Sequence, residues 1–283
     1  MSPARTILIT GCSSGIGAAL AREFHARGHR VIATGRKLEA LAPLAAAGMR
    51  SWVLDVTDAA SIEGLVRSLG DEPLDLLINN AGYGQFGAMT DQTVADLRAQ
   101  FDTNVFAPVA LTGALLPSLR RSAQPCVAHV GSISGLVPTP FSGAYAASKA
   151  ALHAVADAMR MELASFGIRV VTVQPGGIVS NFGNAGSEHI HMPPASPFQP
   201  MSKLILRRAK VSQLQATPTE VFARTVARHL LDPSSGPICR TGKRSLILPL
   251  MKRLLPTRWM DRTLRQRFGL AAFVSARRPD RQP

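Results

Sequence analysis

Short runs of apolar residues recur along the first part of the chain, and each run is bounded by glycine, proline or polar positions. Most of these runs are continuously apolar rather than alternating, which is typical of parallel strands that are buried on both faces of a sheet. The pattern predicts strands at Ile7–Thr10, Arg30–Thr34, Ser51–Leu54, Leu74–Asn79, Cys126–Val130 and Ile168–Gln174.

Between the predicted strands, apolar positions recur with helical spacing. These segments predict helices at 16–27, 38–47, 59–69, 92–102, 106–121 and 144–166. Strands that alternate with helices indicate an α/β fold with a doubly wound parallel sheet, the Rossmann architecture, in a single domain. Ligands bind such sheets beyond the carboxyl ends of the strands. The residues that follow strand ends are Gly11, Asn80, Ser132 and Pro175.

A glycine-rich turn, Gly11–Gly17, joins the first predicted strand to the first helix. In this order of strand, turn and helix, backbone N–H groups and the positive end of a helix dipole converge at one point. The glycines permit a tight turn and the close approach of a ligand. The turn therefore predicts the pyrophosphate site of a dinucleotide, with a purely structural turn as the alternative.

Tyr145 and Lys149 lie four residues apart in an alanine-rich segment, so both are expected on one face of a helix. An ammonium group near a phenol favours the phenolate, which predicts a Tyr145 pKa lowered from about 10 towards neutral pH. A phenol tuned in this way can donate a proton to a carbonyl oxygen or take one from an alcohol. Taken alone, the spacing also fits an ordinary surface contact.

Together, these motifs resemble those of the short-chain dehydrogenase/reductase family. In chain order they are Thr10–Gly17, Asn79–Gly82, Asn104, Ser132, Tyr145 with Lys149, and Pro175–Gly176. The resemblance covers roughly residues 5 to 185. It implies a Rossmann fold, a nicotinamide cofactor and oxidoreductase activity on CH–OH groups.

The resemblance also implies a role for each catalytic residue. Tyr145 would be the general acid in reduction and the base in oxidation, and Lys149 would hold the nicotinamide ribose and lower the Tyr145 pKa. Ser132 would hydrogen-bond the substrate oxygen and fix it near the hydride donor. Asn104 would hold a water that links Lys149 to solvent.

Two cations follow the second predicted strand, where an acidic residue would bind the ribose 2′-hydroxyl of NAD. Arg36 and Lys37 stand there, and the first acid, Glu39, already belongs to the next helix. Because arginine can bind a phosphate with two parallel hydrogen bonds, this pattern predicts NADP(H) as the cofactor, mainly through Arg36.

By resemblance, Asp55 after the third strand would accept from the adenine amino group, and Pro175–Gly176 would shape the nicotinamide pocket. Ser180 stands where the family usually has a threonine for the carboxamide, and it keeps a hydroxyl. The full set of expected cofactor-binding residues is Gly11, Ser13, Ser14, Gly15, Ile16, Gly17, Arg36, Asp55, Val56, Asn80, Ala81, Gly82, Tyr145, Lys149, Pro175, Gly176, Ile178 and Ser180.

The composition fits a globular protein, because 46% of the 283 residues are hydrophobic and 18% are charged. Three scattered cysteines are too few for a disulfide framework or a zinc site, and His189 and His191 stand in a proline-rich segment without a cluster of cysteines or acids. No metal is therefore expected. The first strand begins close to Met1 and no apolar run could span a bilayer, which predicts a cytoplasmic protein.

Most of the positive charge lies near the C-terminus. Residues 236–283 contain twelve Lys/Arg and two Asp/Glu, a net charge of +10 out of +14 for the chain. Trp259, Met260, Leu264 and Phe268 recur at helical spacing with arginines between them, which predicts a basic amphipathic helix.

We divide the chain into an NADP-binding domain, residues 1–248, which includes the substrate loop at about 181–216, and a basic amphipathic extension, residues 249–283. Such a helix suits peripheral contact with an anionic membrane surface, and docking on the protein itself is the equal alternative. Nucleic acid is not expected as a partner, since the chain has no nucleic-acid-binding motif.

The segment at about 181–216 is rich in apolar residues and proline, and by resemblance it is the variable substrate loop. Together with the long tail, it resembles the branch of the family that contains 1-acyldihydroxyacetone phosphate reductases, 17β-hydroxysteroid dehydrogenases and retinol dehydrogenases. This implies a lipophilic ketone, aldehyde or secondary alcohol as the substrate. Two alternatives from other classes remain: an NADP-binding sensor or scaffold without turnover, and a membrane-surface adaptor.

Small residues on two of the predicted helices, 106–121 and 144–166, permit the close approach of another helix. Family members commonly pair through these helices, so we expect a homodimer or homotetramer.

Overall fold

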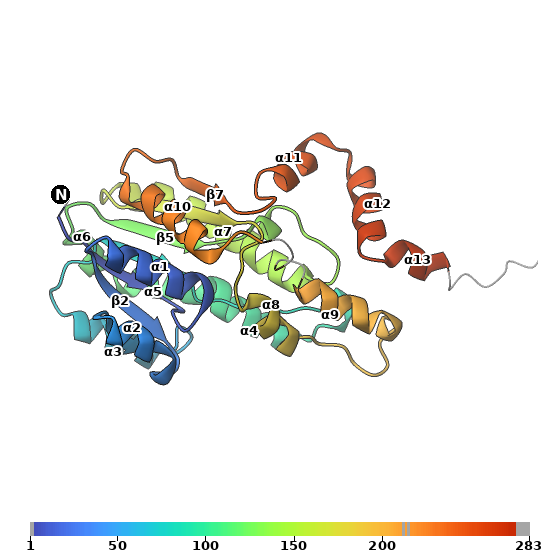
Figure 1. The fold of residues 1–283 in the computed structure, drawn as a ribbon, viewed down its shortest axis with the longest axis horizontal. Coiled ribbons are helices and arrows are strands. Elements are labelled where there is room, and N and C mark those ends of the chain that lie inside the picture. Colours follow the sequence, from blue (N-terminus) through green and yellow to red (C-terminus); the bar gives the residue numbers. More distant parts are fainter. Residues whose placement is uncertain (1–2, 211–212, 214–215, 276–283) are drawn as a thin grey trace, which may run out of the picture.

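A seven-stranded parallel sheet forms the centre of the molecule in the computed structural model, which describes residues 3–210, 213 and 216–275 (Figure 1). The strand order is β3-β2-β1-β4-β5-β6-β7, and each neighbouring pair is parallel. The chain therefore switches direction across the sheet at β1, which lies between β2 and β4. The strands are β1 Thr6–Ile9, β2 Arg30–Gly35, β3 Arg50–Val53, β4 Leu76–Asn79, β5 Cys126–Val130, β6 Arg169–Pro175 and β7 Ile238–Thr241.

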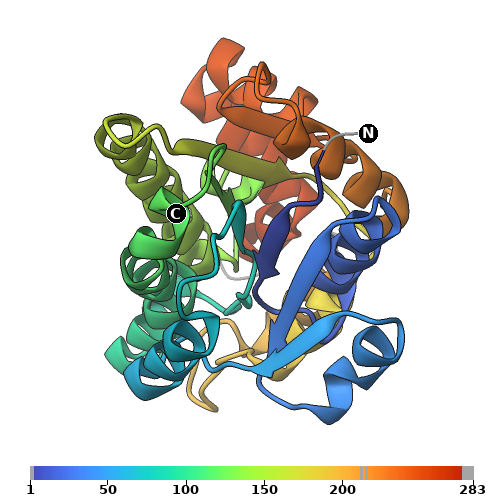
Figure 2. The same cartoon turned by 90° about the vertical axis from the view of Figure 1, so that its left-hand side faces the viewer.

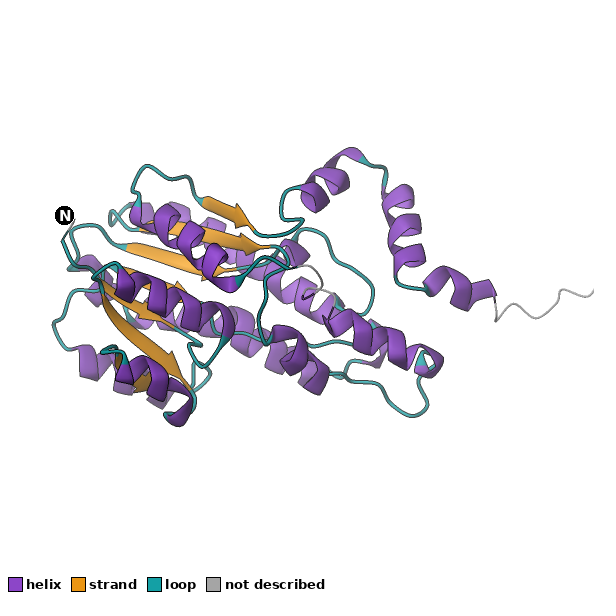
Figure 3. Ribbon diagram, in the orientation of Figure 1, coloured by secondary structure: helices purple, strands orange, loops and turns teal. Residues whose placement is uncertain are grey.

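Helices cover both faces of this sheet (Figures 2 and 3). Alternate residues of β1 show why: Ile7 and Ile9 belong to the core under one layer of helices, while Leu8 belongs to the core under the other. The first layer consists of α1 Gly15–Ala26, α2 Ala42–Ala46 and α10 Thr219–Leu231. The second contains α3 Ala59–Leu69, α5 Ala107–Ala114, α6 Leu116–Arg120 and α7 Gly143–Ala164. The predicted doubly wound fold is thus confirmed.

The predicted elements differ from the structure mainly near prolines and beyond the motifs. Helix 106–121 is two helices, α5 and α6, because Pro117 supplies no N–H for a continuous helix. Helix 92–102 is α4 Val94–Phe101, which runs into a π-helical turn, Asp102–Phe106. Strand β7 and helix α10 were not predicted.

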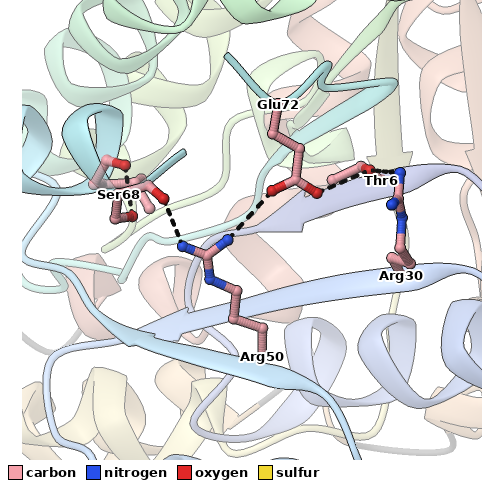
Figure 4. A network of polar contacts seen from close by, with 6 residues as sticks. Thr6, Arg30, Arg50, Ser68 and Glu72 are labelled. Carbon is pink, nitrogen blue, oxygen red and sulfur yellow. Dashed lines mark hydrogen bonds and ion pairs between the residues drawn. The ribbon is translucent and has the colours of Figure 1, made fainter. Parts of the chain in front are cut away.

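A polar network ties together the amino ends of three strands and the turn before β4 (Figure 4). The Arg30 guanidinium donates to the Thr6 hydroxyl at 2.8 Å, and Arg50 donates to the Ser68 carbonyl at 2.8 Å. Glu72 lies between them, paired with Arg50 at 3.3 Å and accepting from Thr6. Thr6, Arg30 and Arg50 are the first residues of β1, β2 and β3, so the network holds the edge opposite to the expected ligand site.

The predicted substrate loop, 181–216, is largely helical. It contains α8 Phe182–Glu188 and α9 Ser202–Lys210, while residues 211, 212, 214 and 215 lie outside the described residues. α9 buries Ile205 and Ala209 completely, so the segment is a packed cover rather than an open loop. Its helices lie beyond the end of the sheet in Figure 1.

Three helices continue the chain past the sheet: α11 Ile247–Leu254, which crosses the expected boundary at 248, and α12 Thr257–Arg267 and α13 Leu270–Ser275, which lie within the C-terminal extension (Figure 1). The predicted amphipathic helix is α12. Leu270 and Phe273 of α13 pack, together with Phe198, against a small core that includes Met201 and Ile205 of the cover, and the Phe273 ring lies 6.1 Å from that of Phe198. The extension is therefore docked on the substrate cover; residues 276–283 lie outside the described residues.

No helix in the described ranges is both long and apolar enough to cross a membrane.

Candidate active site

The expected site lies at the carboxyl edge of the sheet, where β1 and β4 end side by side. The Thr10 hydroxyl accepts from the backbone N–H groups of Asn80 and Ala81, both at 2.9 Å. The Asn80 side chain donates back to the carbonyls of Thr10 at 2.8 Å and Gly11 at 3.1 Å. The glycine turn and the Asn80–Gly82 segment, about 70 residues apart in the chain, are thus one rigid unit.

The glycine turn leaves no room for side chains. Gly11 has φ +72°, and a Cβ on Gly17 would lie 2.3 Å from the Gly11 carbonyl oxygen. α1 begins at Gly15. Among the described residues, the Ser14 side chain accepts no hydrogen bond from the N–H groups at the start of this helix. These N–H groups face the cavity lined by Gly11, Ser14, Gly15 and Ile16, so the turn fits a pyrophosphate.

Tyr145 projects into the cavity from α7 and is buried, with 9% of its surface exposed. Burial raises the pKa of its phenol above 10, because the phenolate would lose its hydration; a hydrogen bond with Ser132 and the charge of Arg208 oppose this shift. The prediction of a lowered Tyr145 pKa is therefore wrong for the protein without ligands. At neutral pH the phenol carries its proton.

Lys149 lies one turn further along α7 and is also buried. Its ammonium donates to the Val130 carbonyl at 2.8 Å and lies 5.9 Å from the centre of the Tyr145 ring. Burial lowers the pKa of Lys149 from 10.5 to about 8. The pair thus lies on one helix face as predicted, and the ammonium is held by β5.

Asn104 is completely buried in the π-helical turn between α4 and α5. Its amide accepts from the Tyr83 N–H at 3.2 Å and donates to the Tyr83 carbonyl and the Ser148 hydroxyl, both at 3.0 Å. A Cβ on Gly82 would lie 2.9 Å from the Asn104 side-chain oxygen and 3.6 Å from the Lys149 ammonium. Gly82 therefore lets Asn104 and Lys149 approach the same point.

His153 supports this site and was missed by the sequence analysis. Its Nε2 accepts from the Ser132 N–H at 3.3 Å. Burial lowers the pKa of His153 to about 4, so the ring is neutral at pH 7 and able to accept. The available signal was its spacing, since His153 follows Lys149 by one helical turn on the same face of α7.

The expected nicotinamide end gathers around the carboxyl end of β6. Pro175, Gly176, Ile178 and Ser180 all line the cavity, as do Ala81 and Gly82 from the opposite side. The backbone N–H of Ser180 donates to the Gln213 side chain at 2.8 Å.

The expected adenine end lies outside the cavity lining. Arg36 follows β2 and is exposed, and its charge contributes to lowering the pKa of Asp55, a shift caused mainly by hydrogen bonds from Thr57. Leu54, whose N–H donates to the Gly35 carbonyl at 2.9 Å, joins the two strand ends. The remaining expected residues away from the cavity wall are Ser13, Gly17 and Val56.

The cavity has a volume of about 550 Å³ and combines the polar groups of the expected catalytic residues with apolar walls. Phe86 and Phe182 form an aromatic wall beside Tyr145, with ring centres 6.4 Å and 5.1 Å from the tyrosine ring. Arg208 from α9 also lines the cavity. Phe182 belongs to the predicted apolar substrate loop, whereas Phe86 and Arg208 were not predicted. The C-terminal extension contributes Met260, Leu264 and Phe268, the apolar face predicted for the amphipathic helix.

The histidines near the cover contact aromatic and acidic side chains. His189 lies with its ring centre 4.6 Å from that of Tyr83, and His191 contacts Asp96 at 3.1 Å. The part of the chain that the structure describes holds no cluster of metal-ligating side chains, and its three cysteines are free and buried.

Comparison with known proteins identifies similar chains. The family model for short chain dehydrogenases matches residues 5–190. Short-chain dehydrogenase cctT of Talaromyces islandicus is 32% identical over 262 residues, which cover 90% of this chain and 92% of that protein. NADPH-dependent 1-acyldihydroxyacetone phosphate reductase of Schizosaccharomyces pombe is 37% identical over 213 residues, 73% of this chain and 72% of that protein.

Among solved structures, a short-chain dehydrogenase from Streptomyces avermitilis has a TM-score of 0.79 at 29% identity, with 97% of this chain and 98% of that chain covered. The match thus extends beyond the motifs to the whole fold. The chain belongs to the short-chain dehydrogenase family, as a dehydrogenase/reductase that acts on CH–OH groups with a nicotinamide cofactor.

Proposed function

We propose that the protein is an NADPH-dependent carbonyl reductase for lipophilic ketones or aldehydes, able to run in reverse on secondary alcohols. The observation that carries this proposal is the convergence of Ser132, Tyr145 and Lys149 on one cavity whose other walls are largely apolar, with burial keeping the Tyr145 pKa high and its phenol protonated. An acid of this kind is needed when a carbonyl oxygen gains negative charge.

In this mechanism the nicotinamide, when bound, supplies the hydride in reduction and accepts it in oxidation. Ser132 holds the substrate oxygen through its hydroxyl, and Tyr145 donates its proton to that oxygen. Lys149 binds the nicotinamide ribose and favours the phenolate that Tyr145 becomes. Asn104, beside Lys149 at Gly82, holds the water through which the proton is replaced. His153 fixes the Ser132 backbone.

The test is NADPH oxidation, followed at 340 nm, against a panel of acyl ketones, steroids and retinoids, each beside a short-chain ketone of the same class. We expect turnover that increases with apolar size. A sensor, scaffold or adaptor would bind NADPH and turn over none of the panel, and the combination of Ser132, Tyr145 and Lys149 in one buried site favours turnover over these alternatives.

NADP(H) is the favoured cofactor because Arg36 lies exposed at the end of β2, where it can bind a 2′-phosphate, and the similar S. pombe reductase is NADPH-dependent by name. Arg36→Asp should lower the NADPH/NADH preference in kcat/KM about 100-fold, since it removes a charge-assisted partner and adds a 2′-hydroxyl acceptor. Arg67→Asp, the same change of charge at an exposed residue of α3, is the control. Equal affinities of the unmodified protein for both cofactors would contradict the assignment.

The outer face of the C-terminal extension supports contact with an anionic membrane. Leu254 and Trp259 are 69% and 61% exposed, and neither lines the cavity. Arg253 and Arg258 are exposed beside them in the sequence, so the extension offers both apolar side chains and cations to a surface. Each cation near an anionic surface contributes about 1 kcal/mol, and salt screens this attraction.

We expect the full-length protein to cosediment with vesicles of mixed anionic and zwitterionic lipid at low salt, and to be released as salt increases. Leu254→Glu/Trp259→Glu should abolish this binding while the cavity stays intact. Deletion of residues 249–283 should in addition reduce activity on long-chain substrates more than on short ketones, because Met260 and Phe268 leave the cavity wall. If the double variant sediments with the vesicles as the parent protein does, the outer face of the extension does not bind membranes, and the extension serves only as part of the cavity wall.

Self-association through α5 and α7 is also proposed. Ala110 and Gly113 on α5, and Ala150 and Ala154 on α7, are exposed, and a Cβ on Gly113 would meet no atom within 4 Å. Ala114 on α5 and Ala151 on α7, two more of the small residues on these helices, are partly buried. We expect a dimer or tetramer by light scattering at micromolar concentration, and Ala154→Glu should shift it towards monomer. Ala60→Glu, at an exposed residue of α3, is the control. A monomeric parent protein would refute the proposal.

A further inference from the structure

Arg208 is a buried cation on α9, with 7% of its surface exposed, at the wall of the cavity. Within the described ranges, no carboxylate pairs with it. Removing a charge from water without a counter-charge costs several kcal/mol. A cation kept at such cost beside a ligand cavity points to a partner that arrives with the ligand.

The contacts of Arg208 orient its guanidinium but do not neutralise it. Nε and Nη2 donate to the Thr139 hydroxyl at 3.0 Å and 2.6 Å, and Nη2 donates to the Ser142 hydroxyl at 2.9 Å. The guanidinium carbon lies 5.6 Å from the centre of the Phe86 ring and 5.4 Å from that of Phe268. Two hydroxyls and two ring faces hold the planar group rigidly, as in a preformed anion site.

The rest of the cavity has the same sign of charge. Its lining includes Lys149, Arg208, Lys243, Arg244 and Arg267, and no Asp or Glu among the residues that the structure describes. The wall is otherwise mainly apolar, through α12 and the phenylalanines. A molecule that matches this surface has an apolar body and an acidic group.

Arg208 and the catalytic tyrosine face the same aromatic side chain. The Phe86 ring centre lies 6.4 Å from that of Tyr145, on a residue that also contacts Arg208. An anionic group bound by Arg208 therefore belongs to the molecule whose carbonyl meets Tyr145.

We propose that Arg208 is the anion-binding residue of the substrate cavity, and that the substrate is a lipophilic carbonyl compound that carries a carboxylate or a phosphate. This inference rests on the proposed carbonyl reductase function and narrows its substrate class. The two acids share the chemistry that a guanidinium recognises, an anionic group whose oxygens accept its hydrogen bonds. Nε and Nη2 already donate to Thr139 and Ser142, so Nη1 is the nitrogen that would donate to the anion.

The first experiment measures binding without turnover, so that it is independent of catalysis. Dodecanoate, dodecyl phosphate and neutral dodecanamide are titrated by calorimetry into the NADPH complex. We expect at least one of the two anions to bind about 10 to 100 times more tightly than the amide, and the preferred anion identifies the acidic group. Equal binding of all three probes overturns the proposal.

The second experiment uses Arg208→Met, which keeps the length of the side chain without its charge, and Arg207→Met, the exposed neighbour on the same helix, as the control. In Arg208→Met the preference for the anion should disappear while amide binding and the NADPH dissociation constant stay unchanged; Arg207→Met should bind as the parent does. Should Arg208→Met not fold, Arg208→Lys, with the charge but not the planar fork, is expected to lose about tenfold in anion affinity.

Kinetics separate this role from an effect on Tyr145. With paired substrates, a keto acid and its methyl ester, the loss in Arg208→Met should lie in KM for the acid alone. An equal fall in kcat for the keto acid and its methyl ester would show that Arg208 acts through the Tyr145 phenol, and it would overturn the proposal. If neither substrate is reduced by the parent protein, the carbonyl reductase function fails, while the calorimetric result still decides whether Arg208 binds anions.

Discussion

Tyr145→Phe should lower kcat/KM for carbonyl reduction about 1,000-fold and leave NADPH binding unchanged. The buried phenol lies in the same cavity as Ser132, and loss of a positioned acid typically costs 100-fold to 10,000-fold. The phenylalanine ring keeps the packing against Phe86 and Phe182. Steady-state kinetics and NADPH fluorescence titration measure the two quantities separately.

The chain contains one other tyrosine, Tyr83, which makes a matched control. Tyr83→Phe removes the same atom from a side chain that packs on His189, and the backbone groups bonded to Asn104 stay in place. Its kcat/KM should change far less than that of Tyr145→Phe. Wild-type turnover in Tyr145→Phe would disprove the mechanism.

Lys149→Met should also abolish most turnover, weaken NADPH binding, and at the same time make the protein more stable at pH 7. The activity is lost because the cation that favours the phenolate and binds the ribose is gone. The stability rises because burial lowers the Lys149 pKa from 10.5 to about 8, so the folded protein holds this proton less well than the unfolded chain does. That shift corresponds to about 3 kcal/mol.

The sign of this effect sets its pH dependence. Below pH 8 the lysine is charged in both states, and the full cost of burying that charge lowers the stability of the folded parent protein. Between pH 8 and 10.5 the unfolded chain binds more protons than the folded protein, so the free energy of unfolding of the parent protein rises with pH. The gain from Lys149→Met, measured by urea unfolding, should therefore shrink across this window. The lost hydrogen bond to the Val130 carbonyl reduces the gain by a constant amount. A loss of stability that is equal at pH 7 and pH 10 would contradict this.

The parts of the fold that could be predicted are those whose pattern is local. Most of the six strands read from the sequence have continuous apolar runs, and the glycine turn requires backbone that few other residues adopt, as the +72° φ of Gly11 shows. Strand β7 was missed because its four residues, Ile238–Thr241, include two polar side chains and lie at the sheet edge. Helix α10 was missed although its apolar residues recur regularly, because it lies beyond the last motif.

The parts of the site that could not be predicted depend on distant contacts. The direction of the Tyr145 pKa shift followed from burial, which spacing along a helix does not reveal. Arg208 is one of two adjacent arginines on α9, and only the fold shows that it is buried while Arg207 is exposed. His153 was recognisable by its spacing, but its partner, the Ser132 N–H, lies 21 residues away.

The network of Thr6, Arg30, Arg50 and Glu72 lies at the opposite rim of the sheet from the chemistry. Exposed pairs of this kind contribute only about 0–1 kcal/mol each, and more when they form a network. Resistance to unfolding therefore draws on the amino ends of the strands, whereas the chemistry belongs to their carboxyl ends. A more heat-resistant catalyst can be sought by strengthening this rim, since changes there leave the substrate preferences of the enzyme untouched.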